Sequence, residues 1–194
     1  MPKKPTTTKE ATIEGAFQLI REQGHESLTA RNLASFLGCS TQPIMYHFAT
    51  MEDLKREAYS RADRFHSDYL MQSTGEYDPI LEIGLNYIRF AIEEPHLFRF
   101  LFQSGYAKEN NLLEMIGSAE LIPVLSAMQE GTGLDEEKTR ELFLTVALFT
   151  HGYASIIANN ALEFDEQLVA THLEHAFNGA VLAVTQEDDY EKAI

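Results

Sequence analysis

The sequence predicts an all-α fold, in which a small N-terminal head of three helices precedes a larger helical body. Apolar residues recur at helical spacing along most of the 194 residues. No run of alternating apolar and polar residues is bounded by hairpin turn pairs, so strands are not expected. A hydrophobic content of 44% supplies enough apolar material for a core. We therefore expect about nine helices and no sheet.

The head is predicted from three short helical segments separated by tight turns. The first covers about residues 8–23 and ends at Gly24, a residue type that favours helix C-termini. The second covers about residues 29–38. The third covers residues 41–47, with Ser40 as its N-cap, and is therefore very short.

The body is predicted to start with a fourth helix opened by Thr50 and Asp53, whose spacing is typical of a capping arrangement. Pro79 opens a fifth helix that reaches about Glu94, and Pro95 opens a sixth that is mostly apolar and aromatic. The remaining expected helices lie at about residues 110–130, interrupted at Gly117 and Pro123, and at about residues 135–160 and 165–186.

Charge is distributed unevenly along the chain. The whole sequence has 15 Lys and Arg against 30 Asp and Glu, which gives a net charge of −15. Residues 1–64 hold 9 basic and 8 acidic residues, which leaves 6 basic and 22 acidic residues for 65–194. An acidic body would be repelled by a phosphate backbone, whereas the nearly neutral head would not be. If any part of the chain binds nucleic acid, we expect it to be the head.

Cysteine usage and the N-terminal sequence both predict a cytoplasmic location. Cys39 is the one cysteine of the chain, so it forms no internal disulfide and no cysteine-built zinc site. The lysines near the N-terminus are not followed by an apolar stretch of signal-peptide length. We expect Cys39 to be a small buried residue in a turn, the alternative being a redox-sensing thiol.

Residues 28–48 place a short helix, a tight turn and a second short helix in sequence, which is the layout of a helix-turn-helix. In that motif the second helix enters the major groove of DNA and the first helix braces it. Gln42, in the first turn of the second helix, is the expected base-reading residue because glutamine can pair bidentately with adenine, and Thr41 can contact a thymine methyl. Phosphate or sugar contacts are expected from Thr29, Arg31, Tyr46, His47 and Lys55.

Two of these assignments have alternatives. His47 could instead cap and pack the end of its short helix. Lys3, Lys4 and Lys9 could form an arm that follows the DNA backbone or enters a minor groove, or they could be a solvated tail.

The segment SLTARNLASFLGCSTQPIMYHFATMEDLK closely resembles the DNA-binding segment of TetR/AcrR-family transcriptional regulators. The residues that match the family pattern are Thr29, Ala34, Gly38, Cys39, Ser40, Tyr46, Phe48, Thr50, Glu52, Asp53 and Leu54. Two positions depart from it: Met45 replaces a tyrosine of the recognition helix, and Met51 replaces a lysine that reaches a phosphate. Tyr46 and Lys55 are the residues expected to take those two roles.

The body partly resembles the regulatory domain of one TetR-family branch, in which an aromatic residue or Trp precedes a His-Gly pair. YIRFAIEEPHLFRFLF and FTHGYASIIANN carry this resemblance, with Phe149 two residues before His151 and Gly152 and with no Trp in the chain. A few polar groups in a strongly aromatic setting suit a small-molecule pocket. The candidate pocket residues are His96, Arg99, Phe102, Tyr106, Phe149 and His151.

These pocket candidates also have simpler interpretations. Most of the aromatic residues could be ordinary core, and His151 could be a core histidine that is hydrogen-bonded across helices. His172 and His175 could chelate a metal, but two imidazoles are too few for a closed site, so we expect no metal and no cofactor.

Residues 142–162 form a stretch of 21 residues without a charge, about the length that spans a bilayer. Several polar residues interrupt this stretch and no cluster of cations flanks it, so we expect no membrane segment. An apolar helix in a soluble protein must be covered, either by its own domain or by a second copy of the chain, and this helix with its neighbour is the best candidate for a subunit interface. We expect a homodimer that forms through residues 135–186.

Together, the head and body predict a ligand-responsive homodimeric transcriptional regulator. Residues 1–54 would form the DNA-binding domain and residues 55–194 the ligand-binding and dimerisation domain. The resemblance implies a repressor of a near-palindromic operator in double-stranded DNA, released by a small-molecule effector. No nucleophile elbow, phosphate loop or HExxH motif points to an enzyme. A small helical enzyme or a scaffolding protein remains the alternative.

Overall fold

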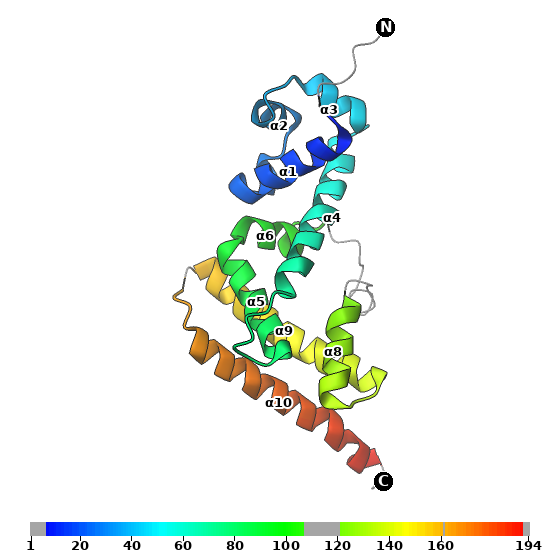
Figure 1. Ribbon diagram of the computed structural model, residues 1–194, viewed down its shortest axis with the longest axis vertical. Coiled ribbons are helices and arrows are strands. Elements are labelled where there is room, and N and C mark those ends of the chain that lie inside the picture. The colour runs from blue at the N-terminus through cyan, green and yellow to red at the C-terminus, as the bar shows by residue number, and fades with distance from the viewer. Residues whose placement is uncertain (1–6, 107–120, 161, 192–194) are drawn as a thin grey trace. The chain divides into compact units, whose positions relative to one another are not determined.

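The computed structural model describes residues 7–106, 121–160 and 162–191, and these fold into nine α-helices and one short 3-10 helix (Figure 1). No strand occurs within these ranges, so the predicted all-α class is confirmed. The described residues separate into two compact units. The head unit contains residues 7–68 and 94–106, and the body unit contains residues 69–93, 121–160 and 162–191.

The head unit contains most of the short helices. In chain order these are α1 (Lys9–Gln23), the 3-10 helix η1 (His25–Ser27), α2 (Ala30–Phe36), α3 (Thr41–His47), nearly all of α4 (Met51–Leu70) and α6 (Pro95–Gln103). The predicted α3 bounds agree with the structure, and the predicted ends of α1 and α2 differ by one or two residues.

Side-chain caps fix where several head helices begin. Thr8 Oγ1 accepts from the Ala11 N–H at 3.1 Å, and Thr29 Oγ1 accepts from the Asn32 N–H at 3.1 Å. Thr50 and Asp53 cap α4 reciprocally, since each side chain accepts a hydrogen bond from the backbone N–H of the other. Ser40 is the N-cap of α3 by its extended backbone, but its side chain makes no capping hydrogen bond.

The helix-turn-helix is held together by buried aliphatic residues. Leu33 of α2, Ile44 of α3 and Leu54 of α4 are all fully buried. Gly38, which has a φ of +63°, makes the turn between α2 and α3 in a conformation that glycine adopts without steric cost. A Cβ on Gly15 would lie 2.6 Å from Leu37 Cδ2, so only glycine lets α1 approach the end of α2 this closely.

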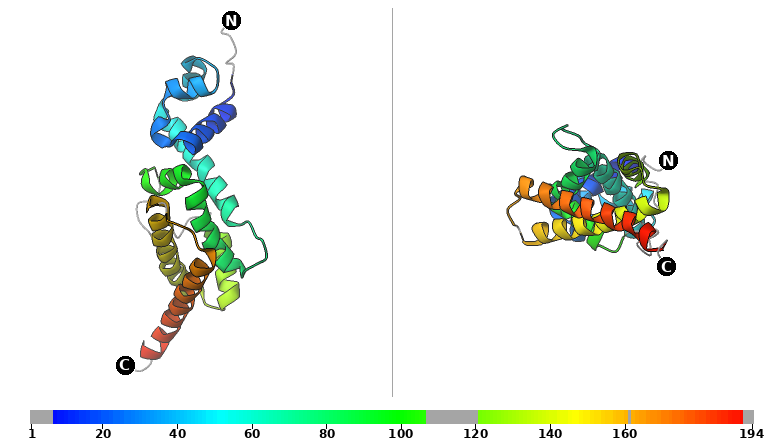
Figure 2. Two further views of the ribbon diagram at one scale, coloured as in Figure 1. Left: turned by 90° about the vertical axis from the view of Figure 1, so that its left-hand side faces the viewer. Right: turned by 90° about the horizontal axis from the view of Figure 1, so that it is seen from below.

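The body unit is built from longer helices. These are α5 (Pro79–Glu93), α8 (Ile122–Thr132), α9 (Glu136–Asn160) and α10 (Glu166–Glu191). Helices α9 and α10 run side by side in opposite directions, and α5 packs against both (Figures 1 and 2). The break predicted at Pro123 coincides with the first turn of α8, whereas the break predicted at Gly117 lies outside the described residues.

A loop in the body unit is tied to α5 by two buried polar side chains. The Glu82 carboxylate accepts from the Thr74 hydroxyl at 2.6 Å, from the Thr74 and Gly75 N–H groups, and from the Ser73 hydroxyl. The Asn86 amide donates to the carbonyl oxygens of Leu70 at 3.1 Å and Gln72 at 2.7 Å. The Asn86 bonds satisfy the carbonyl of Leu70, the last residue of α4, and that of Gln72 just after it.

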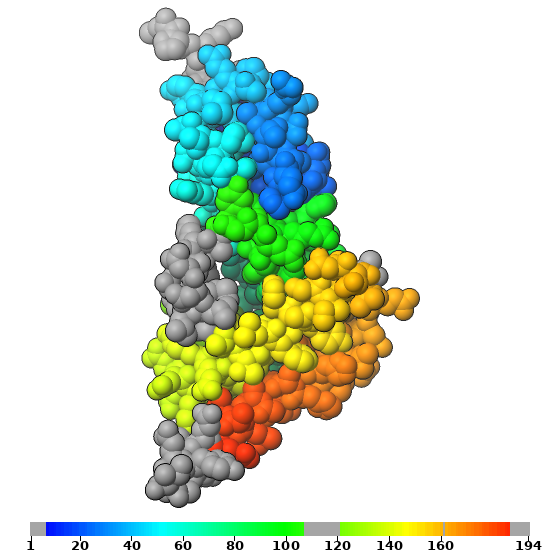
Figure 3. Space-filling view, turned by 180° about the vertical axis from the view of Figure 1, so that it is seen from behind, coloured from blue at the N-terminus to red at the C-terminus, as the bar shows by residue number. Residues whose placement is uncertain are grey.

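Helices α9 and α10 lie at the surface on one side of the body unit (Figure 3), and both leave large apolar side chains exposed. The exposed residues of this face, which we call the α9–α10 face, are Leu148, Phe149, Ile156, Leu168 and Leu182. Among the described residues, α9 is the one helix long and apolar enough to cross a membrane by length and composition, and 22% of its most apolar window is buried within this chain. Most residues of that window are therefore not fully buried among the described residues.

Candidate functional site

Helix α3 presents four side chains outward from the head core. Thr41 and Gln42 are exposed in its first turn, and Met45 and Tyr46 follow one turn later. Residues four apart lie above one another on a helix, so these side chains form one continuous stripe opposite the fully buried Ile44. Tyr46 is 73% exposed, compared with 41% for Met45. The stripe combines the predicted base-reading residues with a predicted phosphate contact.

The predicted phosphate contacts at the start of α2 are also exposed. Arg31 is exposed in the first turn of this helix. Thr29 is exposed as well, although its hydroxyl already caps α2. Both residues belong to the same packed motif as α3, because Leu33 of α2 and Ile44 of α3 share the head core.

Lys55 has a different environment from the other predicted DNA contacts. Its ammonium donates to Glu52 Oε1 at 3.0 Å and lies 5.5 Å from the centre of the Tyr106 ring. Tyr106 and Glu52 both raise the pKa of Lys55, so the side chain is held as a cation. The structure therefore brings together Lys55, predicted to bind phosphate, and Tyr106, predicted to line the ligand pocket.

His47, another predicted DNA contact, is hydrogen-bonded within the head. Its Nε2 lies 2.8 Å from the carbonyl oxygen of Thr7, the residue before the α1 cap. A carbonyl oxygen only accepts, so His47 Nε2 must carry the proton. The ring is half-buried and meets Tyr46 edge to face. Sequence reasoning missed this pair because the two residues are 40 positions apart. Lys3 and Lys4, which precede Thr7, lie outside the described residues.

The six candidate pocket residues are divided between the two units. His96, Arg99, Phe102 and Tyr106 belong to the head unit, and Phe149 and His151 belong to the body unit. In the head unit, the His96 ring lies next to Gly24. Phe102 contacts the rings of Phe98 and His66. Burial lowers the pKa of His66 to about 4, so this imidazole is neutral at pH 7.

Both ring nitrogens of His151 are hydrogen-bonded, and one of these bonds links α9 to α5. Its Nδ1 lies 2.8 Å from the Tyr87 hydroxyl of α5, and its Nε2 lies 3.3 Å from the Ser155 hydroxyl on the next turn of α9. Burial raises the pKa of Tyr87 and lowers the pKa of His151, so both groups are neutral at pH 7. The phenol then donates to Nδ1, and Nε2–H donates to Ser155. This geometry suits a structural link, and direct ligand contact by His151 stays a prediction.

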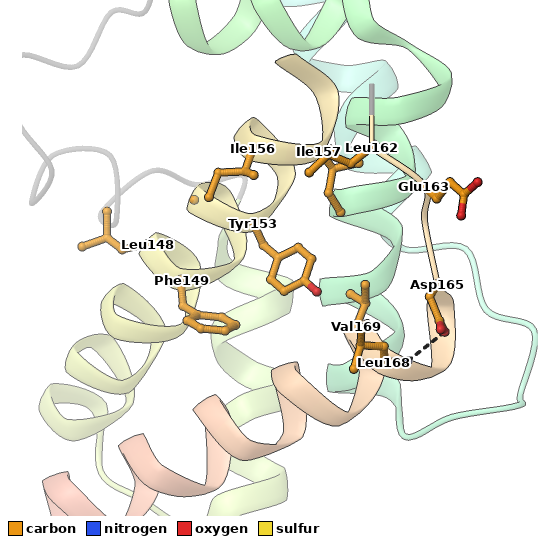
Figure 4. A pocket seen from close by; sticks show the side chains of 11 residues that line it. Leu148, Phe149, Tyr153, Ile156, Ile157, Leu162, Glu163, Asp165, Leu168 and Val169 are labelled. Carbon is orange, nitrogen blue, oxygen red and sulfur yellow. Dashed lines mark hydrogen bonds between the residues drawn. The ribbon is translucent and has the colours of Figure 1, made fainter. Parts of the chain in front are cut away.

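An apolar groove of about 470 Å³ lies between α9 and the start of α10 (Figure 4). Phe149, Tyr153 and Ile156 line it from α9, and Leu168 and Val169 line it from α10. Of the predicted pocket residues, Phe149 is the one that lines this groove. Two acidic residues, Glu163 and Asp165, stand at one end, where Asp165 accepts a hydrogen bond from the Leu168 N–H at 3.1 Å.

Histidines on α10 do not gather ligands for a metal within the described ranges. No group of three or more His, Cys, Asp or Glu residues there is placed to hold a metal ion. His172 Nδ1 instead lies 3.3 Å from the Tyr153 hydroxyl of α9.

Residues 80–180 match a protein family described as "Tetracyclin repressor-like, C-terminal domain", which covers more than half of the chain. This match does not identify the branch with the His-Gly pair, which stays a prediction. No curated protein sequence is similar enough to count as a relative.

Solved structures of TetR-family regulators share the fold. A regulator from Streptomyces coelicolor has a TM-score of 0.70 and 17% identity, over 93% of this chain and 82% of that one. A TetR variant from Acinetobacter baumannii, solved in complex with minocycline, has a TM-score of 0.52 and 16% identity, over 95% and 98% of the two chains. A possible TetR-family regulator, also from Streptomyces coelicolor, has a TM-score of 0.51 and 17% identity, over 96% and 99%.

Proposed function

This chain belongs to the TetR family of transcriptional regulators, and from that premise we propose that it is a homodimeric, ligand-responsive repressor of a near-palindromic operator. The observation that carries the proposal is the stripe of Thr41, Gln42, Met45 and Tyr46 exposed on α3 over a buried helix-turn-helix core. A helix presented in this way fits the major groove of double-stranded DNA.

Within this proposal, side chains on the head have separate roles. Gln42 reads an adenine edge, and Thr41 contacts a thymine methyl beside it. Arg31, Thr29 and Tyr46 bind phosphate or sugar and set the register of the head on the duplex without reading sequence. Lys55 reaches a phosphate after it exchanges its contact with Glu52, so its contribution is smaller than that of Arg31.

The α9–α10 face supports a homodimer. A second copy of the chain, related by a two-fold axis, buries the exposed apolar side chains of both copies against each other. Such a dimer carries two heads, and each head reads one half-site of the operator. A two-fold protein therefore requires an operator that is close to palindromic.

The body supplies the effector response. A small molecule bound among aromatic side chains of the chain favours one of two body conformations and thereby changes the spacing of the two heads. One structural relative was solved in complex with minocycline, which is consistent with an effector of that size. We propose that the repressor acts in the cytoplasm without associating with a membrane and that it catalyses no reaction.

The experiment that tests the base-reading role begins with selection of bound duplexes from a random pool. The selected operator is then bound by wild-type protein and by Gln42→Ala. We expect the variant to lose discrimination at one position in each half-site, at a cost of about 1–3 kcal/mol. Gln23→Ala removes an exposed glutamine of α1 and serves as the control, with discrimination unchanged.

Two results would contradict parts of this proposal. If the random pool yields no enriched sequence, the chain does not read DNA and the regulator function fails. If Gln42→Ala weakens binding equally on all duplexes, Gln42 contacts phosphate and another residue of the α3 stripe reads the base.

A further inference from the structure

Helix α10 carries a row of exposed residues whose spacing is that of a coiled-coil seam. The members follow one another at intervals of 4, 3, 4 and 3 positions, so they lie along one face of the helix. This row, which we call the α10 seam, consists of Leu168, His172, His175, Gly179 and Leu182, all exposed. Leu168 is 50% exposed and Leu182 is 58% exposed. The described part of the chain therefore leaves both ends of the seam open to a partner helix.

A second copy of the chain is the partner that suits the charge of this seam. No seam residue is Asp, Glu, Lys or Arg, although residues 65–194 hold 22 acidic and only 6 basic residues. Two such acidic bodies repel each other, so close contact between them requires an uncharged surface. The seam is continuous with the α9–α10 face, because Leu168 and Leu182 belong to both. We therefore place the α10 seam within the homodimer contact.

The two histidines lie near the middle of the seam. When two seams pack antiparallel about a two-fold axis, Leu168 of one copy lies near the partner's Leu182. The axis then crosses the seam near its midpoint, at His175, with His172 about one turn away. A Cβ added to Gly179 would meet nothing within 4 Å in this chain, which leaves room there for an imidazole of the partner. Both copies therefore bring their histidines to the same place.

The spacing of the two histidines suits a shared ligand. Side chains three positions apart on a helix are neighbours, with about 5–6 Å between their Cβ atoms. His172 and His175 are both exposed on α10, so their rings are accessible to a partner copy. Two imidazoles are too few for a closed zinc site, which takes four ligands. Two copies of the chain supply four imidazoles.

Tyr153 of α9 holds one of these imidazoles from behind. Its side chain points from α9 towards α10 (Figure 4), and its hydroxyl lies 3.3 Å from His172 Nδ1. The described chain gives the His172 ring no other hydrogen bond, so Nε2 is the nitrogen left for a metal ion. A histidine bound to a metal through one nitrogen commonly donates its other N–H to a polar group, and a tyrosine hydroxyl can accept it.

We propose that His172 and His175 of both copies bind one Zn²⁺ ion at the two-fold axis of the dimer. Four imidazoles suit the tetrahedral coordination that zinc prefers. Because these ligands are neutral, the ion keeps its positive charge, which the acidic body attracts. The ion joins the two chains and so strengthens the dimer. This inference rests on the proposed function, because it requires a second copy to cover the α9–α10 face.

Zinc titration of the intact chain, prepared without an affinity tag, tests the inference. Calorimetry gives the stoichiometry, and sedimentation equilibrium gives the dimer association constant with and without zinc. We expect one Zn²⁺ ion for every two chains. At a free zinc concentration about 100-fold above its Kd, the dimer association constant should rise about 100-fold, since the ion binds only the dimer. Co²⁺ in place of zinc should show the visible absorption of a tetrahedral site.

Variants of α9 and α10 assign this effect to residues. His172→Gln/His175→Gln should reduce the zinc-induced rise in the association constant from about 100-fold to none. Gln167→Ala/Asn178→Ala, the matched control, changes two exposed polar residues of α10 outside the seam and should keep the full rise. Tyr153→Phe, which removes the hydroxyl behind His172, should weaken zinc binding about 10–100-fold while one ion per two chains is retained.

The possible failures are distinguishable. If wild type is monomeric both with and without zinc, the homodimer of the proposed function fails. If wild type dimerises but binds no zinc, or if the histidine variant keeps the zinc-induced rise, only the metal site fails. One ion for every chain would place the site within a single copy and overturn the shared site. Because stoichiometry and the Co²⁺ spectrum are measured on wild type, they test the inference even if the histidine variant does not fold.

Discussion

The head unit and the α9–α10 face bury their apolar residues to different extents. In the head, Leu33, Ile44 and Leu54 are fully buried within one chain, so the exposed stripe of α3 rests on a complete core. On the α9–α10 face, Ile156 and Leu182 are each 58% exposed. Leaving such side chains in water forgoes roughly 25 cal/mol for every Å² of apolar surface that a partner could cover. The difference teaches that the head unit packs its core within one chain, whereas the body unit leaves an apolar face that the proposed second copy would cover.

The largest effect is expected from disrupting the α9–α10 face. Ile156→Asp places a charge at the centre of the proposed interface, where burial without a partner is costly. We expect a folded monomer by sedimentation velocity and a loss of operator affinity of about 10²–10⁴-fold, because the two heads are no longer linked.

The matched control for this change is Ile122→Asp. Ile122 is 60% exposed on α8, so it has similar accessibility but does not belong to the α9–α10 face. We expect Ile122→Asp to remain dimeric. A dimer of unchanged stability in Ile156→Asp would show that this face is not the interface.

Truncating a buried side chain of the head core should lower the stability of the head unit without affecting dimerisation. Ile44→Ala removes a fully buried side chain and should lower the stability of the head by about 2–5 kcal/mol. Hydrogen exchange should then accelerate in α1–α3 while sedimentation still reports a dimer. The neighbouring change Met45→Ala removes a partly exposed side chain and should alter stability by about 0.5 kcal/mol or less. Equal losses from both variants would contradict a packed core beneath α3.

Acid should destabilise the head unit through the buried His66. Burial lowers the pKa of His66 from 6.5 to about 4, so the unfolded chain takes up a proton at higher pH than the folded one. The head unit therefore loses stability as the pH falls from about 6.5 to about 4, on the order of 3 kcal/mol in total. His66→Phe should abolish this loss, as measured by hydrogen exchange of head amides in wild type and in the variant. A persistent loss in His66→Phe would assign it to another group.

The smallest expected change concerns the acid stability of the body unit, through the Glu82 carboxylate that holds the loop before α5. Hydrogen bonds from Ser73 and Thr74 lower the pKa of Glu82 from 4.5 to about 2, with a further contribution from the Gly75 N–H. The stabilisation is present above pH 4.5 and is lost as the pH falls towards 2. Glu82→Gln should remove this pH dependence from thermal unfolding of the body unit.

Glu76→Gln is the control for this change, since it neutralises an exposed carboxylate in the same loop. It should leave the acid profile of the body unit unchanged. An identical profile for Glu82→Gln and wild type would mean that the carboxylate is not stabilised by its loop.

Most of the fold prediction rested on sequence patterns among neighbouring residues. The Thr50–Asp53 cap, the glycine at the α2–α3 turn and the bounds of α3 each depend on residues within three or four positions, and each is confirmed. The assignment to an all-α TetR-like fold follows from the same patterns and from the family resemblance.

Contacts between distant residues could not be read from spacing. The Arg21–Glu94 ion pair joins residues 73 positions apart, and it places α6 in the same compact unit as α1. The sequence offered no reason to group residues 94–106 with the head. For the same reason, the sequence suggested that the six candidate pocket residues line one site, whereas four of them belong to the head unit and two to the body unit. The functional boundary expected at residue 54 stays a prediction.

The most direct test of the account is operator binding by the intact dimer, measured as affinity and as chains bound per duplex. The selected operator is compared with a version in which one half-site is scrambled. We predict two chains on the intact operator and an affinity at least about 100-fold weaker on the scrambled one, since only one head then binds specifically. A single chain per duplex, or an affinity indifferent to scrambling, would contradict the claim that two heads of one dimer read the two half-sites.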